Sequence, residues 1–165
     1  MTDGRIAAEK FRSTEMKYKR YKISGKDIYI AGDETEICYI GYTEPEGEEV
    51  ETPLIKEAFS QIEEYLRGKR KEFVLPLRDF GKSRSGRIWK EIAKIPYGKT
   101  VTYKELCKKT GYGRAYRYIG KICGENPLAI VVPCHRVVGQ RGLCGYAGGV
   151  GLKRELLELE KRNSF

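Results

Sequence analysis

The run TYKELCKKTGYGRAYRYIGKIC, residues 102–123, determines the architecture of the second half of the chain. Thr102 can cap a first short helix, and Glu105 falls at the third position of that helix, as in a capping box. A glycine-rich turn, residues 111–113, comes next, and residues 114–123 form a second short helix. Two short helices joined by a glycine turn predict a helix-turn-helix.

The second of these helices mixes basic residues with aromatic and small ones. It is either a solvated amphipathic helix or an element that docks on nucleic acid. Ala115 and Gly120 have side chains small enough to let another surface approach the backbone closely. The formal net charge of +9 and the isoelectric point near 9.3 favour a polyanionic partner, although lysine-rich surfaces are often merely solvated.

A second informative segment, VVPCHRV at residues 131–137, joins Cys134 to His135, which is the single histidine of the chain. A thiol acts as a nucleophile in its thiolate form, and a neighbouring base or cation such as Arg136 lowers its pKa from about 8.5. The β-branched residues before Pro133 favour extended backbone, so we expect a buried strand that ends by presenting the sulfur beside the imidazole. A Cys-His pair alone is more often structural than functional, but its surroundings favour a functional site here.

The first half of the chain has the pattern of a small sheet with one helix. Three short strand-like runs joined by tight turns predict an antiparallel meander over residues 18–23, 27–31 and 36–42. Residues 44–52 are acidic and resemble a surface loop. Thr52 then caps a helix that ends at Gly68.

The chain therefore divides into two domains of an α/β (α+β) protein. We expect an N-terminal α/β domain over residues 1–72, a linker over 73–86 and a mostly helical C-terminal domain over 87–165. A glycine-rich loop, residues 142–151, precedes a terminal helix at residues 152–161. Residues 1–16, outside these elements, are polar and predict a frayed helix or a flexible arm.

Several classes of protein are disfavoured by composition. No apolar run approaches the roughly 18 residues of a membrane span, and the first residues have no apolar signal region, so we expect a cytoplasmic protein. An odd number of scattered cysteines and a single histidine argue against a zinc site and for free thiols. Asn and Gln are nearly absent, which fits a heat-adapted source.

These residues together resemble the O6-alkylguanine-DNA alkyltransferases, also called methylated-DNA–protein-cysteine methyltransferases. The resemblance covers residues 84–161, and the active-site pattern Ile-x-x-Pro-Cys-His-Arg-Val stands here at residues 130–137. Further matching motifs are Tyr97 to Tyr103, Arg117 to Gly120, Asn126-Pro127 and Gly145 to Gly149. The family implies a ribonuclease H-like N-terminal domain and a winged-helix-like C-terminal domain.

By this resemblance, Cys134 accepts an alkyl group from the O6 oxygen of a damaged guanine in double-stranded DNA. The thioether product cannot be hydrolysed by the protein, so each molecule acts once and needs no cofactor. A relay from Glu160 through His135 and a water molecule would withdraw the thiol proton. Tyr103 would protonate or hydrogen-bond the departing guanine and crowd the DNA phosphate.

The resemblance also implies how DNA and the base are held. Arg117 would enter the base stack in place of a flipped nucleotide, while the recognition helix lies in the minor groove. Asn126 would tie the helix-turn-helix to the active-site segment. The DNA-binding residues expected are Tyr103, Arg114, Ala115, Arg117, Gly120, Lys121 and Arg136.

The expected substrate pocket consists of Val137, Tyr146, Ala147 and Gly148. The backbone carbonyls of Cys134 and Val137 would read the guanine amino group, the amide of Ala147 would face O6, and Tyr146 would form a wall. Many relatives have serine at the position of Ala147, and the zinc ligands of some relatives have no counterpart in this sequence.

Two other functions compete with DNA repair. One is a DNA-binding regulator that uses the helix-turn-helix without transfer, and the other is a cysteine hydrolase with a Cys-His pair. The regulator should not need Cys134, and the hydrolase should turn over many times. A monomer is expected, because one transfer needs only one pocket, and activity on O4-alkylthymine stays open.

Overall fold

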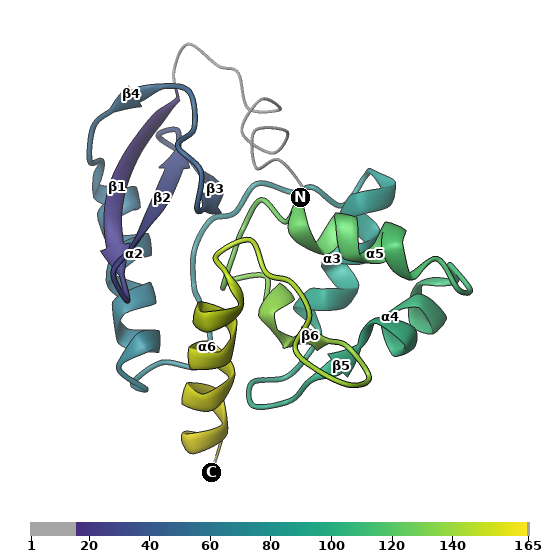
Figure 1. Ribbon diagram of the computed structural model, residues 1–165. Helices are drawn as coiled ribbons and strands as arrows, with labels where there is room; N and C mark the ends of the chain where they lie inside the picture. Colours follow the sequence, from purple (N-terminus) through teal and green to yellow (C-terminus); the bar gives the residue numbers. More distant parts are fainter. Residues whose placement is uncertain (1–15, 165) are drawn as a thin grey trace. The chain divides into compact units, whose positions relative to one another are not determined.

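The computed structural model describes residues 16–164, which form two compact units (Figure 1). Unit 1 contains the described residues up to Arg78 together with Pro127–Ala129, and unit 2 contains Asp79–Asn126 and the residues from Ile130 onward. The arm expected at the N-terminus lies outside the described residues, apart from Met16. The predicted domain limits, 1–72 and 87–165, stay a proposal about how the chain folds.

Unit 1 is built on a four-stranded sheet with the order β3-β2-β1-β4. Its strands are β1 (Lys17–Ile23), β2 (Lys26–Gly32), β3 (Ile37–Gly41) and β4 (Glu48–Glu49). The first three pair antiparallel, as the predicted meander requires. Ser24 and Gly25 join β1 to β2 with positive φ angles of 48° and 76°, the backbone that a two-residue hairpin favours.

The short strand β4 lies inside the segment expected to be a surface loop, so that expectation was incomplete. It runs parallel to β1 and begins where the amide of Glu48 donates to the carbonyl of Met16 at 3.0 Å. An unpaired edge of β1 leaves backbone groups without partners, and β4 supplies two residues of pairing.

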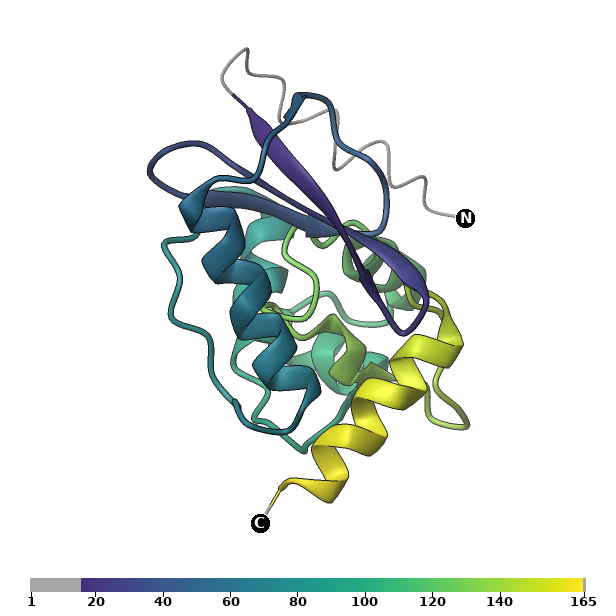
Figure 2. The ribbon, with the colours of Figure 1, turned by 90° about the vertical axis from the view of Figure 1, so that its left-hand side faces the viewer.

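One helix, α2 (Pro53–Leu66), lies along one face of this sheet (Figure 2). The hydroxyl of Thr52 accepts a hydrogen bond from the amide of Ile55 at 3.1 Å, and Pro53 occupies the first turn, which confirms the predicted start. Gly68, with φ of 73°, follows its end. The buried face of α2 consists of Ile55, Ala58, Gln61, Ile62 and Tyr65.

Two segments distant in sequence cover the free edge of β3. The amide of Ile37 donates to Pro76 O at 2.7 Å, and the amide of Ile40 donates to Pro127 O at 2.8 Å. Residues 76–78, expected to be part of a linker, therefore pair with the sheet. Patterns local to one segment could not reveal this, because the partner strand lies about 40 residues away in the chain.

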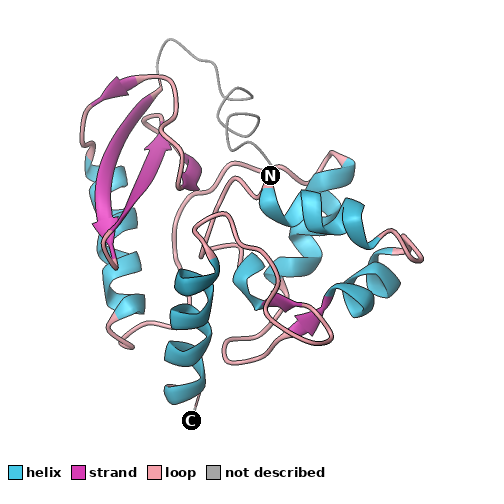
Figure 3. Cartoon of the chain, in the orientation of Figure 1, coloured by secondary structure: helices cyan, strands magenta, loops and turns pink. Residues whose placement is uncertain are grey.

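Unit 2 is mostly helical, with one two-stranded parallel sheet (Figure 3). Its helices are α3 (Arg84–Ala93), α4 (Tyr103–Thr110), α5 (Tyr116–Gly124), the 3₁₀ helix η1 (Cys134–Arg136) and α6 (Val150–Arg162). The strands β5 (Val101–Thr102) and β6 (Val137–Val138) pair Val101 with Val137 and Thr102 with Val138. Helix α3 begins inside the expected linker, because the hydroxyl of Ser83 caps it through the amide of Gly86 at 2.9 Å.

The helix-turn-helix is formed by α4 and α5. Thr102 and Glu105 form the expected capping box: Glu105 donates its amide to the Thr102 hydroxyl at 3.1 Å, and Thr102 donates its amide to the Glu105 carboxylate at 2.8 Å. Gly111 ends α4 with φ of 77°, and the connecting turn leads to Ala115, the N-cap of α5. The predicted pair of helices is confirmed.

The core of unit 2 is continuous with its cysteine segment. Residues from three helices and from the segment after them pack into one apolar cluster, which includes Ile88, Trp89, Ile92, Leu106, Ile119, Ile122, Cys134 and Val137. The indole of Trp89 donates to Ile122 O at 2.9 Å, which ties α3 to α5. The cysteine is thus part of the core itself.

The prediction of a strand directly before Cys134 is wrong. Ile130 has a left-handed backbone with φ of 70°, rare for a β-branched residue, and residues 130–131 form a turn. Pro133 has no amide hydrogen to give a sheet, and the amide of Cys134 donates back to Val132 O at 2.8 Å. Cys134 therefore opens the helix η1, and extended backbone resumes only at β6.

No helix within residues 16–164 is both long enough and apolar enough to cross a membrane.

Candidate active site

The thiol of Cys134 lies in the interior of unit 2, with 5% of the residue exposed. Burial raises the pKa of this thiol, whereas a hydrogen bond with the side chain of Asn126 and the charge of Lys153 act to lower it. The sequence led us to expect a lowered pKa. In the interior the loss of hydration outweighs the neighbouring charge, so the resting sulfur holds its proton and needs a base to remove it.

Asn126 connects the end of α5 to this sulfur. Its amide nitrogen donates to Val132 O at 2.8 Å, across the turn that carries Ile130, and its side chain also bonds the Cys134 sulfur. One side chain therefore fixes the turn and the thiol together. The family resemblance led us to expect a connecting role for Asn126, and that role stays a prediction.

A buried network of side chains joins η1 to α6. Nε2 of His135 lies 3.0 Å from Oε1 of Glu160, and both side chains are almost fully buried, at 0% and 1% exposure. Nη2 of Arg136 donates to the same Glu160 oxygen at 2.7 Å, and Nε of Arg136 lies 3.0 Å from each carboxylate oxygen. Glu160 thus receives hydrogen bonds from two neighbouring side chains of one short helix.

This network sets the protonation of its members. Burial alone would raise the pKa of Glu160, but the hydrogen bonds from His135 and Arg136 lower it to about 2. Burial lowers the pKa of His135 against the opposing effect of Glu160, so the imidazole is neutral. A carboxylate can only accept, so the proton of a neutral His135 is assigned to Nε2, and Nδ1 carries the basic lone pair.

The buried position of Arg136 contradicts its expected contact with DNA. It was expected to contact DNA, yet the residue is only 7% exposed, and its guanidinium donates to Glu160 and, through Nη1, to Ile95 O at 2.6 Å. Its charge is directed inward to a carboxylate, not outward to a phosphate. Its position next to His135 in the sequence gave no sign of this, because the partner lies 24 residues later in the chain.

Lys153 was overlooked, because the sequence placed it among the charged residues of an amphipathic terminal helix. Its side chain is fully buried, and Nζ donates to Val137 O at 2.6 Å and to Gly145 O at 3.1 Å. Nζ also lies 5.8 Å from the centre of the Tyr103 ring. A lysine at the second position of an expected helix looks ordinary, and its place directly after the apolar Leu152 was the only available signal.

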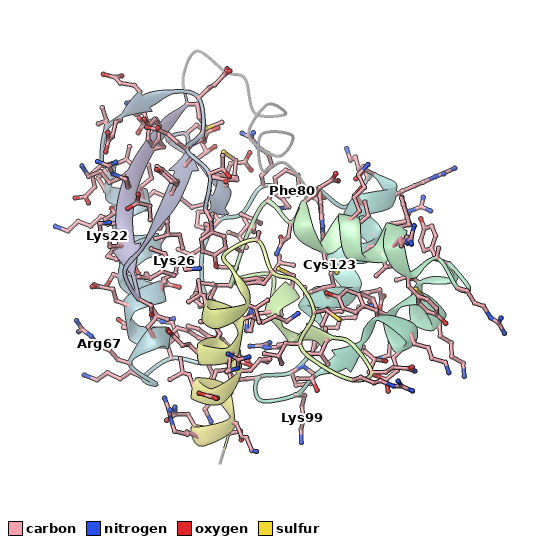
Figure 4. All side chains as sticks on the ribbon, in the orientation of Figure 1. Lys22, Lys26, Arg67, Phe80, Lys99 and Cys123 are labelled. Carbon is pink, nitrogen blue, oxygen red and sulfur yellow. The ribbon has the colours of Figure 1, made fainter. Side chains whose placement is uncertain are left out.

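Tyr103 begins α4 beside the site. Burial raises the pKa of its phenol, and the nearby thiols of Cys123, Cys144 and Cys134 raise it further. The phenol therefore stays protonated at neutral pH and can donate a hydrogen bond. Cys123 itself lies inside unit 2, whereas Lys99 reaches away from it (Figure 4).

The expected pocket residues are on η1, β6 and the glycine-rich loop before α6. Val137 is fully buried, and its carbonyl accepts from Lys153, while the carbonyl of Cys134 accepts from the amide of Val137. Each carbonyl oxygen has two lone pairs, so each can accept one more hydrogen bond. Tyr146 stands edge-on to His135, with ring centroids 6.5 Å apart; Ala147 is exposed and Gly148 is buried.

The helix α5 and the two residues before it carry most of the residues expected to bind DNA. Arg114, Arg117 and Lys121 are exposed, and Ala115 and Gly120 are half-buried. A methyl group built on Gly120 would lie 3.9 Å from the Tyr103 ring, so this face continues into the site. Nζ of the exposed Lys121 lies 3.9 Å from an oxygen of the largely buried Glu125, a long contact that leaves the ammonium available to a phosphate.

Within residues 16–164, no three His, Cys, Asp or Glu side chains gather closely enough to hold a metal ion.

Family models match both units. The model described as 6-O-methylguanine DNA methyltransferase, DNA binding domain, matches residues 84–162. The model described as 6-O-methylguanine DNA methyltransferase, ribonuclease-like domain, matches residues 16–78. The second match supports the ribonuclease-like expectation for the N-terminal sheet, which the sequence resembled only in outline.

Individual relatives agree with these matches. The chain is 39% identical over 145 residues to the methylated-DNA–protein-cysteine methyltransferase of Methanosarcina barkeri, which covers 82% of this chain and 91% of that protein. It is 46% identical over 105 residues to the protein of that name from Mycobacterium tuberculosis, which covers 63% and 64% of the two chains.

Solved structures match as well. A crystal structure of Mycobacterium tuberculosis OGT in complex with DNA superposes with a TM-score of 0.80 and 34% identity, covering 89% of this chain and 94% of that one. The expectation of a heat-adapted source finds no support in these comparisons.

Proposed function

The chain belongs to the 6-O-methylguanine DNA methyltransferase family and transfers an alkyl group from damaged DNA to a cysteine, and on this premise we propose that Cys134 is the acceptor and O6-alkylguanine in duplex DNA the substrate. The observation that carries the proposal is the buried thiol of Cys134 next to the His135–Glu160 pair. None of the four other cysteines is next to a histidine in the sequence, because His135 is the single histidine of the chain.

The transfer is a single in-line displacement. The thiol proton leaves through a water molecule to Nδ1 of His135, whose Nε2–H is held by the Glu160 carboxylate. The sulfur then forms a bond to the alkyl carbon, the bond from that carbon to O6 breaks, and its electron pair stays on the guanine. The guanine recovers one proton and the sulfur becomes a thioether, so atoms and charge balance.

Tyr103 serves the leaving group. Its raised pKa keeps the phenol protonated, so it can donate a hydrogen bond to the guanine as negative charge develops. The carbonyls of Cys134 and Val137 each retain a lone pair for the guanine amino group, and the Ala147 amide faces O6. Tyr146 lines the pocket next to Gly148.

A guanine inside a duplex cannot reach a buried sulfur, so the nucleotide must leave the base stack. Unstacking costs a few kcal/mol and less for a damaged base. Arg117 on the exposed face of α5 fills the vacated place, and Ala115 and Gly120 let the helix lie in the minor groove. Arg114 and Lys121 contact the phosphates, whereas the guanidinium of Arg136 is hydrogen-bonded to Glu160.

The test uses a duplex that carries one O6-methylguanine, followed by intact mass measurement and peptide mapping. We expect one added methyl group, about 14 Da, on Cys134 of each molecule and unmodified guanine in the duplex. The matched control is Cys107→Ser, which removes a buried thiol elsewhere in unit 2 and should leave transfer unchanged. No adduct on the folded wild type, or equal transfer by Cys134→Ser, would refute the proposal.

The competing functions give different outcomes in the same experiment. A cysteine hydrolase would release product repeatedly without a lasting adduct, and a regulator would bind the duplex equally well with and without Cys134 and leave the lesion intact.

A further inference from the structure

Tyr116 is a feature of the helix-turn-helix that the transfer described above does not use. It is the first residue of α5, and 40% of it is exposed. Within residues 16–164 it is the only aromatic residue among the exposed large apolar side chains. The connection between α4 and α5 that leads to it lies at the outer edge of unit 2 (Figure 1).

The other tyrosines of this helix pair have a different environment. Tyr103, Tyr112 and Tyr118 are partly buried and pack against the apolar core of unit 2, and the rings of Tyr112 and Tyr118 lie 5.2 Å apart between centroids. In the part of the chain that the structure describes, the side chain of Tyr116 makes neither a ring contact nor a hydrogen bond. Both faces of its ring are therefore available to a partner.

Helix geometry places this ring next to the expected DNA contacts. Gly120 follows Tyr116 by one turn on the same face of α5, and a methyl group built on Gly120 would lie 3.9 Å from the Tyr103 ring. Arg117 lies about 100° further round the axis, on the stripe that includes Lys121. The first turn of α5 thus presents a ring and a guanidinium side by side, with the ring on the face that leads to the site.

The charge around Tyr116 favours a polyanion. Arg114 and Arg117 are both exposed, and neither has a carboxylate partner among residues 16–164. The first turn of α5 also contains no acidic residue. These charges attract phosphates and repel a cationic partner, so the occupant that fits this surface is the duplex DNA of the proposed function.

A duplex that has released one nucleotide offers a flat surface for such a ring. When a base leaves the stack, its neighbours each lose a stacking contact. The guanidinium of Arg117 is smaller than the guanine that it replaces, so it leaves part of those base faces uncovered. An aromatic ring stacks on any base, because every base has a π face.

We propose that the ring of Tyr116 stacks on a base next to the vacated position, beside Arg117, and so favours the duplex from which the lesion has left the stack. This role rests on the proposed function, in which Arg117 fills the vacated place. Tyr116 is accordingly a residue that selects opened DNA, whereas Arg114 and Lys121 bind phosphates in any duplex.

The experiment compares binding to two duplexes of one sequence, one intact and one with a tetrahydrofuran abasic site in place of the lesion. The abasic duplex has the vacated position from the start, and fluorescence anisotropy measures both affinities. We expect the wild type to prefer the abasic duplex. Tyr116→Ala should bind that duplex about tenfold more weakly and the intact duplex almost unchanged, because the bases of the intact duplex already cover one another.

Two further substitutions test whether stacking causes the preference. Tyr116→Phe retains the ring and should behave like the wild type, whereas Tyr116→Leu retains apolar bulk without a flat face and should lose the preference. If Tyr116→Ala does not fold by circular dichroism, the Leu variant decides. A wild type without a preference for the abasic duplex, or a Leu or Ala variant that keeps it, would overturn the proposal, as would a Phe variant that loses it.

Two controls separate this role from general effects on binding. Lys121→Gln removes a charge from the neighbouring stripe and should weaken binding to both duplexes by the same factor. Val74→Ala removes an exposed apolar side chain from unit 1 and should change neither affinity. An equal loss on both duplexes in Tyr116→Ala would make Tyr116 a general surface contact and contradict its selective role.

Neither duplex carries an alkyl group, so this comparison is separate from the test of Cys134 as acceptor. Methyl transfer from an O6-methylguanine duplex is measured in parallel on the same proteins. A wild type that prefers the abasic duplex but takes no methyl group would contradict the proposed function. A wild type that takes the methyl group, together with an Ala variant of unchanged preference, would contradict the role of Tyr116 alone.

Discussion

At the scale of single residues, the site depends on one carboxylate. Glu160 holds both His135 and Arg136, and its low pKa is a consequence of those bonds. Breaking a buried ion pair from one side costs more than the pair contributes, because the remaining charge is left without a partner. Glu160 therefore acts on stability and on the acceptor thiol at the same time.

We predict that Glu160→Gln destabilises the protein most at neutral pH. The folded pKa of about 2 lies below the ordinary 4.5, so the stabilisation is complete above pH 5 and is lost as the pH falls toward 2. A shift of this size corresponds to roughly 3 kcal/mol at pH 7. Urea denaturation at pH 7 and pH 3 should show a large difference from wild type at the first and a smaller one at the second.

The control for this substitution is Glu158→Gln, an exposed position on the same helix, which should change stability little at either pH. An equal loss at both pH values for Glu160→Gln would mean that the carboxylate charge is not what stabilises the network.

At the scale of secondary structure, the caps of α4 position the reacting groups. Tyr103 is the first residue of this helix, so the capping box of Thr102 and Glu105 fixes the phenol as well as the helix start. Thr102 also pairs with Val138, which joins β5 to β6, the strand that directly follows η1. The capping box, which is visible in the local sequence, thus helps to position α4 beside the segment that carries Cys134.

We predict that Thr102→Ala costs about 1 kcal/mol of stability, because the amide of Glu105 at the start of α4 loses its acceptor. The melting temperature should fall by about 2–4 °C, and methyl transfer should slow as Tyr103 loses its fixed position. Thermal denaturation and single-turnover transfer measure the two effects. The control Lys104→Ala, at the exposed position after Tyr103, should change neither the melting temperature nor the transfer rate. An unaltered transfer rate in Thr102→Ala would mean that the cap does not position the Tyr103 phenol.

How well the sequence predicts this protein depends on how local each interaction is. The capping box, the Thr52 cap and the hairpin strands were predicted, because their determinants lie within a few residues. The turn at Ile130 was not predicted, because its left-handed backbone opposes the preference of a β-branched residue for strands. The hydrogen bond from Asn126 to Val132 and the packing of the turn hold it in that conformation. The roles of Arg136 and Lys153 could not be read at all, because their partners are distant in the chain.

At the scale of the whole molecule, the positive charge favours DNA whatever its sequence. The net charge is +9, and the exposed basic residues of α5 give part of it a defined place in the DNA-binding domain. Contacts with phosphates release counterions, so the binding should weaken as salt increases.

We predict that affinity for an undamaged duplex falls steeply between low and physiological salt. Replacing Arg114 or Lys121 by Gln should reduce the slope of log K against log salt by about one for each lost phosphate contact. Fluorescence anisotropy with a labelled duplex measures the slope. Lys56→Gln, exposed on α2, should leave it unchanged; identical slopes for all three variants would exclude phosphate contacts by α5.

Lys153 and Glu160 share one helix, α6, and stand seven positions apart, so about two turns separate them along one face. Both groups consequently travel together whenever that helix shifts or frays. A mutation that distorts α6, although distant in sequence from Cys134, would therefore disturb at once the carboxylate that holds His135 and the lysine contacts to Val137 and Gly145.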